Sequence, residues 1–180
     1  RQSLSLADNI ETIPAGVVCK ANGDMFVDID SLNHERWVYA YLRKEEYLWR
    51  DYQWNLTVTR HSNFRELQFG IRYQDFYNRY RFRHENNAFH FDIVKNGKFY
   101  NSILKKHFPM KLNKKYKLSL SCQKFYFCLK VDGIRILEAF DLYGHFMEGP
   151  IAIILWEDNR KTPISLTIEK QSIISLHRVK

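Results

Sequence analysis

Apolar side chains recur at every second position through most of the chain, and this period of two constrains the fold more than any other feature of the sequence. In Leu67–Tyr73 the odd positions carry Leu, Phe, Ile and Tyr, whereas the even positions carry polar residues or glycine. The same alternation runs through Phe89–Ile93, Lys117–Cys122 and Phe125–Val131. Because successive side chains of a β-strand point to opposite faces, each segment predicts a strand with one face in a core.

Three Asn-Gly or Asp-Gly pairs separate predicted strands. They are Asn22-Gly23, Asn96-Gly97 and Asp132-Gly133. Both central residues of a type I′ turn need a positive φ, which Asn, Asp and Gly adopt at low cost, so each pair predicts a two-residue β-hairpin. Roughly a dozen strands at a spacing of about 8–12 residues then indicate an antiparallel sandwich or barrel.

The length and composition of the chain favour a single globular domain over residues 1–180. Apolar residues make up 45% of the 180 positions and aromatic residues 16%, and there is neither an internal repeat nor a low-complexity linker. This is enough apolar material for one substantial core. No run of about 18 uncharged apolar residues occurs, so we expect no membrane span. Because the chain begins with Arg1 rather than Met, we expect it to be part of a longer protein.

Basic residues outnumber acidic ones. There are 28 Lys and Arg against 20 Asp and Glu, a formal net charge of +8. Such a balance favours an anionic partner, for example an acidic glycan, a nucleic acid or a phosphorylated surface. The basic residues are spread along the chain without a dense block, which disfavours a nucleic acid.

The three cysteines, Cys19, Cys122 and Cys128, are too few for a disulfide framework. A tight turn at Gln123-Lys124 would place Cys122 on the face of Phe125 and Cys128 on the opposite face. We therefore expect Cys122 and Cys128 to remain unbridged and to be buried thiols.

Several short strand signatures follow one another in an order that occurs in a known superfamily of β-sandwiches. The first is an early strand at Asp51–Val58, followed by a strand with Gly-hydrophobic-Arg at Leu67–Tyr73 and a strand with Tyr-Arg-Phe at Phe76–Phe82. A hairpin with Val-Asp-Gly at Lys115–Asp141 and a late strand at Ile164–Ile168 complete the order. This order resembles the concanavalin A-like lectin/glucanase superfamily, in particular its laminin-G-like and 3-keto-disaccharide hydrolase-like domains. The sequence departs from the pattern at Ala152 and Ser165, where the superfamily often has glycine and aspartate, which is typical of a distant member.

The resemblance implies an all-β jelly roll, a two-sheet antiparallel β-sandwich, with a ligand on the concave sheet face and its rim loops. Strand parity places seven polar side chains on one such face, opposite the core: Gln68, Arg72, Arg79, Arg81, Arg83, His90 and Asp92. Arginine offers planar, bidentate donors for carboxylates, sulfates, phosphates or vicinal hydroxyls, and the rings of Tyr77 and Trp156 offer flat faces for sugars. These nine residues are the candidate ligand-binding set. The alternative is a solvated sheet face whose arginines pair with neighbouring acids.

Catalytic and metal sites have less support in the sequence. Asp28-Ile29-Asp30 has the alternate spacing of a carboxylate pair, but it lies outside the resembling stretch, and no Glu-x-Asp-x-x-Glu pattern occurs. We therefore assign no catalytic residue, although an enzyme could use Asp92, His90 or Glu157. The scattered histidines have no metal-ligand spacing. A Ca²⁺ ion is the one possible cofactor, and Glu157-Asp158-Asn159 is its candidate loop.

The sequence thus predicts a non-catalytic carbohydrate-binding module for anionic or polar glycans, attached to a glycan-processing protein. Two alternatives stay open. One is a glycoside hydrolase or lyase of the keto-sugar hydrolase type, and the other is a protein-interaction or assembly domain. Titration with charged and neutral oligosaccharides, turnover assays and size-exclusion chromatography distinguish the three.

Overall fold

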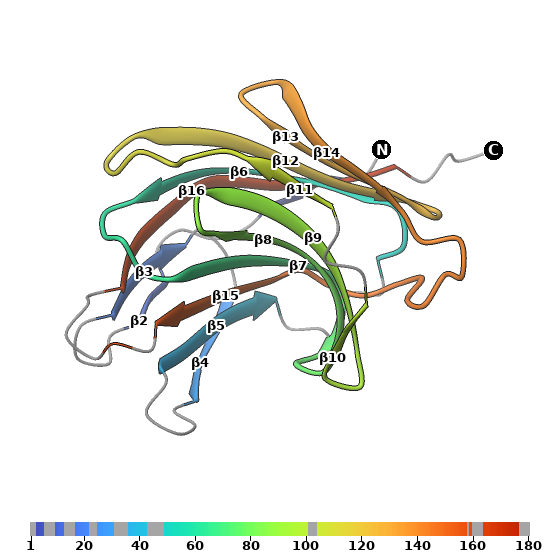
Figure 1. Ribbon diagram of the computed structural model, residues 1–180, viewed down its shortest axis with the longest axis horizontal. Coiled ribbons are helices and arrows are strands. Elements are labelled where there is room, and N and C mark those ends of the chain that lie inside the picture. Colours follow the sequence, from blue (N-terminus) through green and yellow to red (C-terminus); the bar gives the residue numbers. More distant parts are fainter. Residues whose placement is uncertain are drawn as a thin grey trace.

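Strands provide the regular structure of the described residues, and they lie in two layers. The computed structural model describes residues 49–100, 104–157, 159 and 164–176, with only the backbone at residue 100, and before residue 49 the backbone of five strands. Each layer is a sheet of eight described strands. Figure 1 shows the two sheets packed face to face. Within the described part of the chain there is no helix with the length and apolar character that a membrane span requires.

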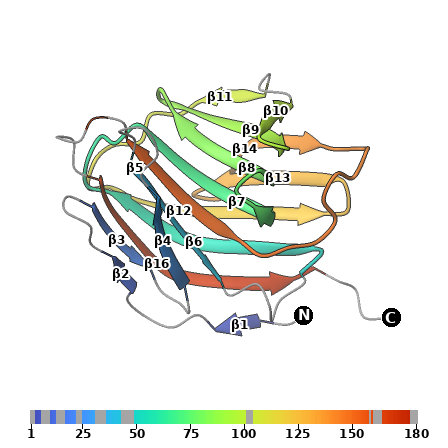
Figure 2. The same ribbon diagram turned by 90° about the horizontal axis from the view of Figure 1, so that it is seen from below.

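The first sheet, sheet A, joins the two ends of the described chain. In spatial order its strands are β14 (Ile134–Phe140), β13 (Tyr126–Val131), β12 (Lys115–Gln123), β6 (Tyr52–Arg60), β16 (Ile164–Ser175), β3 (Val17–Ala21) and β2 (Ile10–Thr12), with β1 (Ser3–Ser5) also paired to β16. Its neighbours are antiparallel, except that β3 and β16 run parallel. Figure 2 shows β1, β2 and β3 beside β16 at one side of this sheet.

The second sheet, sheet B, is antiparallel throughout its described pairs. In spatial order its strands are β10 (Lys98–Tyr100), β9 (Ala88–Lys95), β8 (Asn78–Glu85), β7 (Glu66–Asp75), β15 (Ala152–Glu157), β5 (Arg36–Leu42) and β4 (Met25–Asp30), with β11 (Lys105–His107) also paired to β9. In Figure 1 strands β7, β8 and β9 bend, and the face turned away from sheet A lies on the inside of the bend. Sheet B therefore presents a hollowed outer face.

The inner faces of the sheets meet in an aromatic core. Trp54 of β6 meets Phe69 of β7 edge to face, with ring centroids 5.8 Å apart. Tyr80 of β8 meets Phe127 of β13 with centroids 4.4 Å apart, and all four side chains are buried. The apolar positions of the period-two pattern point inward. This confirms the predicted two-sheet β-sandwich.

Two of the three predicted hairpins are confirmed. The φ angles are 51° and 76° at Asn96-Gly97, which joins β9 to β10, and 51° and 80° at Asp132-Gly133, which joins β13 to β14. The hairpin predicted at Asn22-Gly23 is wrong, because β3 and β4 on either side of it lie in different sheets. A turn signal predicts a change of chain direction, but the partner of each flanking strand depends on where its apolar face is buried.

The thiols of Cys122 and Cys128 are buried and free, as predicted. In the register of β12 and β13, Cys122 lies opposite Phe127 and Cys128 lies opposite Ser121. Directly opposed residues share a face, so the two thiols project from opposite faces of the sheet. The side chain of Cys19 lies outside the described residues.

The turn between β12 and β13 lies one residue later than predicted. Gln123 pairs with Tyr126, so the turn residues are Lys124, with φ of 53°, and Phe125. Phe125 is consequently 41% exposed and does not join the core, contrary to the predicted parity.

Candidate functional site

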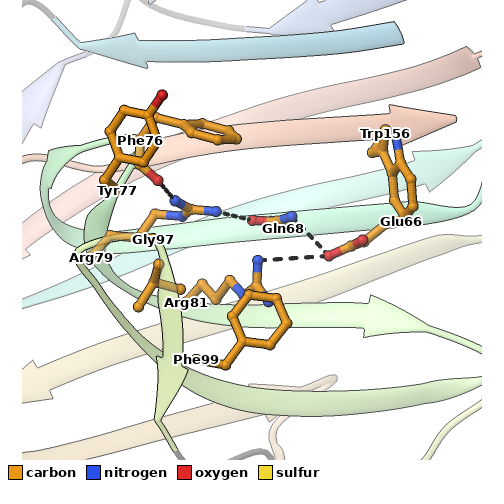
Figure 3. A pocket seen from close by; sticks show the side chains of 10 residues that line it. Glu66, Gln68, Phe76, Tyr77, Arg79, Arg81, Gly97, Phe99 and Trp156 are labelled. Carbon is orange, nitrogen blue, oxygen red and sulfur yellow. Dashed lines mark hydrogen bonds and ion pairs between the residues drawn. The ribbon is translucent and has the colours of Figure 1, made fainter. Parts of the chain in front are cut away.

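The hollowed outer face of sheet B contains an open groove of about 340 Å³. Strands β7, β8, β9, β10 and β15 and two hairpin turns supply its lining, which consists of Glu66, Gln68, Phe76, Tyr77, Arg79, Arg81, Val94, Gly97, Phe99 and Trp156. Figure 3 shows these side chains converging on one space. Five of the nine predicted ligand-binding residues are among them: Gln68, Tyr77, Arg79, Arg81 and Trp156.

Two hairpin turns form one end of the groove and are bonded to each other. The amide of Gly97 donates to the carbonyl of Tyr77 at 2.9 Å, and the amide of Asn96 donates to Oδ1 of Asn78 at 3.0 Å. Asp75 Oδ1 accepts a further bond from the amide of Tyr77 at 2.7 Å. These bonds hold the β7–β8 turn against the β9–β10 turn, so that the aromatic residues of this rim have a defined position.

A chain of polar contacts crosses the floor of the groove (Figure 3). Arg79 Nη2 donates to Gln68 Oε1 at 2.9 Å, and Gln68 Nε2 donates to Glu66 Oε1 at 2.8 Å. Arg81 Nη1 lies 3.8 Å from the same Glu66 oxygen. The floor thus combines guanidinium groups, an amide and a carboxylate in one network of buried side chains that line the groove.

Glu66 is a buried carboxyl group in this floor. Burial raises its pKa to about 7, and the charge of Glu85, its cross-strand neighbour, acts in the same direction, whereas Arg81 and Arg83 act against it. Arg83 Nε lies 3.8 Å from Glu66 Oε1. The protonation of Glu66 therefore changes near neutral pH.

Arg81 and Arg83 share one buried carboxylate outside the lining. Their Nε atoms donate to Asp92 Oδ2 at 2.7 and 2.8 Å. Burial alone would raise the pKa of Asp92, but these hydrogen bonds and charges outweigh it and lower the pKa below its ordinary value. His90 lies opposite Arg83 in the register, and burial, followed by the charge of Arg83, lowers its pKa. Arg83, Asp92 and His90 do not line the groove; Asp92 acts by orienting Arg81.

Aromatic rings form the rim above the polar floor. Phe99 is 60% exposed, and the Arg81 guanidinium carbon lies 4.3 Å from its ring centroid. Tyr77 is 57% exposed on the opposite side of the groove, and Trp156 stands beside Glu66 (Figure 3). Exposed rings over hydrogen-bonding groups can stack on the apolar face of a flat ligand.

Arg72 lies elsewhere, and its predicted place on this face is wrong. The pairing of β7 with β8 is interrupted between Ile71 and Asp75, and Arg72 has a φ of 48°. This bulge turns its side chain away from the groove, to a site where it is fully buried and its guanidinium carbon lies 5.4 Å from the core ring of Phe127. Its nitrogens donate to Asp51 Oδ1 and to three carbonyl oxygens, those of Arg50, Lys124 and Phe146. These hydrogen bonds connect three segments distant in sequence to strand β7, so Arg72 has a structural role.

Sequence reasoning missed Glu66 and Phe99. Glu66 has the same parity as Gln68 and begins the same strand, so extending the alternating pattern by one residue would have found it. Phe99 follows the Asn96-Gly97 turn and pairs with Val94, which places both residues on the groove side. A two-residue turn at Asn96-Gly97 already implies that Phe99 pairs with Val94, so the turn signal could have placed Phe99 on this face.

The predicted calcium loop is only partly described. Glu157 is buried, and its Oε2 accepts a bond from the amide of Asn159 at 3.2 Å, while Asp158 lies outside the described residues. Across the described part of the chain, no group of three or more His, Cys, Asp or Glu side chains could hold a metal ion. Calcium binding by this loop stays a prediction.

Comparison with known proteins shows the type of fold. A carbohydrate-binding module, CBM66 from Bacillus subtilis, superposes with a TM-score of 0.53 at 14% identity, over 81% of this chain and 92% of that one. The Caenorhabditis elegans galectin LEC-6 gives a TM-score of 0.52 at 12% identity, over 81% and 99%. A Bacillus subtilis protein of unknown function with a galectin-like fold gives 0.62 at 8% identity, over 83% and 86%. The chain therefore has a lectin-like β-sandwich fold.

Sequence comparison adds no family. No protein-family model matches the chain, and no curated protein matches it. The structural neighbours are galectin-like and CBM66 sandwiches, so they support the lectin-like sandwich that the resemblance implied without establishing the concanavalin A-like superfamily. At these identities the likeness concerns the fold alone.

Proposed function

We propose that this chain binds carbohydrate in the groove on sheet B, as a non-catalytic module of a glycan-processing protein. The single observation that carries the proposal is the Arg79–Gln68–Glu66 network beneath the exposed rings of Phe99 and Tyr77. A sugar hydroxyl both donates and accepts hydrogen bonds, and the side chains that line this floor include both donors and acceptors. The apolar face of a sugar ring packs on flat aromatic surfaces.

The fold supports this proposal without deciding it. One structural neighbour is described as a carbohydrate-binding module and another as a galectin. The groove lies on the hollowed face of the sandwich, where the sequence resemblance implied a ligand. Membership of the concanavalin A-like superfamily is part of the same proposal, and it rests on the order of the strand signatures.

The experiment is calorimetric titration of the full chain with a panel of neutral and acidic oligosaccharides. Phe99→Ala removes an exposed ring from the rim, and we expect affinity to fall about tenfold. Tyr143→Ala is the matched control, because Tyr143 is 91% exposed and does not line the groove. Both variants should melt at nearly the wild-type temperature. The proposal is refuted if no glycan binds the folded chain, or if both variants lose affinity equally.

Catalysis is tested with the same panel. A carboxyl group with a pKa near neutrality in a groove is a candidate general acid, and Glu66 has this property. Turnover of an oligosaccharide that is lost in Glu66→Gln would favour the glycoside hydrolase alternative over a binding module.

A further inference from the structure

Arg79 is a buried cation without a counter-ion among the described residues. The side chain of Arg79 lines the groove, and Arg79 as a whole is 2% exposed. Nη1 donates to the carbonyl of Phe76 and Nη2 donates to the neutral side chain of Gln68. Within the described part of the chain no Asp or Glu lies at ion-pair distance from it. Arg79 therefore has no carboxylate in direct contact; the charges of Glu66 and Asp92 act on it only from beyond ion-pair distance, and its guanidinium carbon lies 4.9 Å from the Phe76 ring centroid.

Strand register explains why Arg79 lacks the acid that its neighbours have. On β9, Asp92 lies opposite Arg81, whereas Val94 lies opposite Arg79. On β7, the bulge after Ile71 interrupts the pairing with β8 at this level. Neither flanking strand therefore places an acidic side chain beside Arg79, although Asp92 serves both Arg81 and Arg83.

The pKa of the Arg79 guanidinium reflects the absence of a paired carboxylate. Burial, followed by the like charge of Arg81, lowers the pKa of Arg79 to about 10, so it remains charged at neutral pH but is poorly stabilised. Two buried donors beside the groove, Arg79 Nε and Arg81 Nη2, have no hydrogen-bond partner among the described residues. An anion in the groove would stabilise the uncompensated charge of the Arg79 side chain.

We propose that the groove takes an acidic residue of a glycan, and that the carboxylate or sulfate of this sugar binds to Arg79. This inference rests on the proposed carbohydrate-binding function and specifies its ligand class. A planar oxyanion offers the acceptors that a guanidinium pairs with best. The rings of Phe99 and Tyr77 then contact the sugar ring, which a free inorganic anion would not use.

The test compares acidic oligosaccharides with their own neutral forms. Tetrasaccharides of galacturonate, mannuronate and glucuronate are titrated beside the same compounds after reduction of their carboxyl groups, and a sulfated tetrasaccharide is titrated beside its desulfated form. We expect at least one acidic compound to bind about tenfold or more tightly than its neutral form. The uronate and sulfate arms show which oxyanion is used.

Two variants direct the test at Arg79. Arg79→Gln should lower the affinity for the acidic compound much more than the affinity for its neutral form, so that the preference between the two disappears. Val94→Asp should have the same effect, because it places an internal carboxylate opposite Arg79, as Asp92 is placed opposite Arg81. Arg135→Gln is the control, since Arg135 is an exposed arginine outside the groove, paired with Glu138. Thermal melting of each variant confirms that it is folded.

The outcomes separate this inference from the proposed function. Equal affinity for acidic and neutral forms overturns the inference and leaves carbohydrate binding intact. A preference that persists in Arg79→Gln overturns the role of Arg79. No binding of any oligosaccharide overturns both proposals. Binding of a single-stranded oligonucleotide as tightly as the best acidic glycan overturns the requirement for a sugar.

Discussion

Replacing Glu66 by Gln should make the folded chain more stable above pH 7 and leave its stability at pH 4 nearly unchanged. The folded state raises the pKa of Glu66 to about 7, from an ordinary value of 4.5, mainly through burial. The folded chain therefore binds this proton more tightly than the unfolded chain does. As a consequence, the free energy of unfolding falls as the pH rises from about 4.5 to about 7, and it changes little with this group outside that range.

The expected size of the effect follows from the pKa. A difference of one pKa unit between folded and unfolded states corresponds to about 1.4 kcal/mol, so a rise from 4.5 to about 7 costs the folded wild type about 3 kcal/mol once Glu66 is ionised. The ion-pair contacts to Arg81 and Arg83 are already included, because they act against the rise. The side-chain amide that Glu66→Gln introduces still accepts a bond from Gln68 but carries no charge to desolvate.

Urea unfolding at pH 4, 5, 6, 7 and 8 measures this prediction directly. The curves of wild type and Glu66→Gln should give nearly equal stabilities at pH 4 and diverge to about 3 kcal/mol at pH 8. Glu138→Gln is the control, because the hydrogen bond to Tyr126 lowers the pKa of Glu138 below its ordinary value of 4.5, so its replacement gives no stability difference that grows between pH 5 and pH 8. A difference between Glu66→Gln and wild type that does not change with pH would refute the reasoning.

Two further predictions concern stability. Arg72→Lys should cost about 3 kcal/mol, since one ammonium group cannot reach the three carbonyl oxygens that Arg72 bonds, yet glycan affinity should not change; loss of binding in a folded variant would contradict this. Phe127→Ala should cost about 3–5 kcal/mol, because its ring is fully buried against Tyr80 and Phe91, and a loss below about 1 kcal/mol in urea unfolding would contradict the packing described.

The layered fold was predictable because it depends on local patterns. Alternation marks each strand wherever one face is buried, and the Asn96-Gly97 and Asp132-Gly133 pairs adopt the positive φ angles that their turn needs. Asn86-Asn87, with φ of 52° and 57°, makes an equivalent turn between β8 and β9 that a search restricted to Asn-Gly and Asp-Gly overlooks. The partners of β3 and β4 were not predictable from the Asn22-Gly23 pair in the sequence between them, since strands that enter different sheets can be adjacent in sequence.

The groove was predictable where the strands are regular and not where they bulge. Parity correctly grouped Gln68, Arg79 and Arg81, because β7 pairs regularly with β8 from Glu66 to Ile71 and β8 pairs regularly with β9 from Arg79 to Glu85. Arg72 follows immediately after this regular stretch, and a single bulge reverses its direction. Nothing in the local sequence predicts this bulge. It packs closely against the distant residue Gly149, where a Cβ would lie 2.7 Å from the Arg72 carbonyl carbon.

The bulge and the register together determine the charge of the groove. If β7 continued its pairing past Ile71 and Tyr80, Arg72 would lie directly opposite Arg79, and two guanidinium groups would face each other on the groove wall. Like charges directly opposed across strands are destabilising. The bulge removes this repulsion by burying Arg72 among carbonyl oxygens, while Val94 on the other side supplies no acid. Arg79 is therefore left with neither a like charge nor a counter-charge directly opposite it. This is the state in which a bound anion gains most, because it does not have to displace a resident carboxylate.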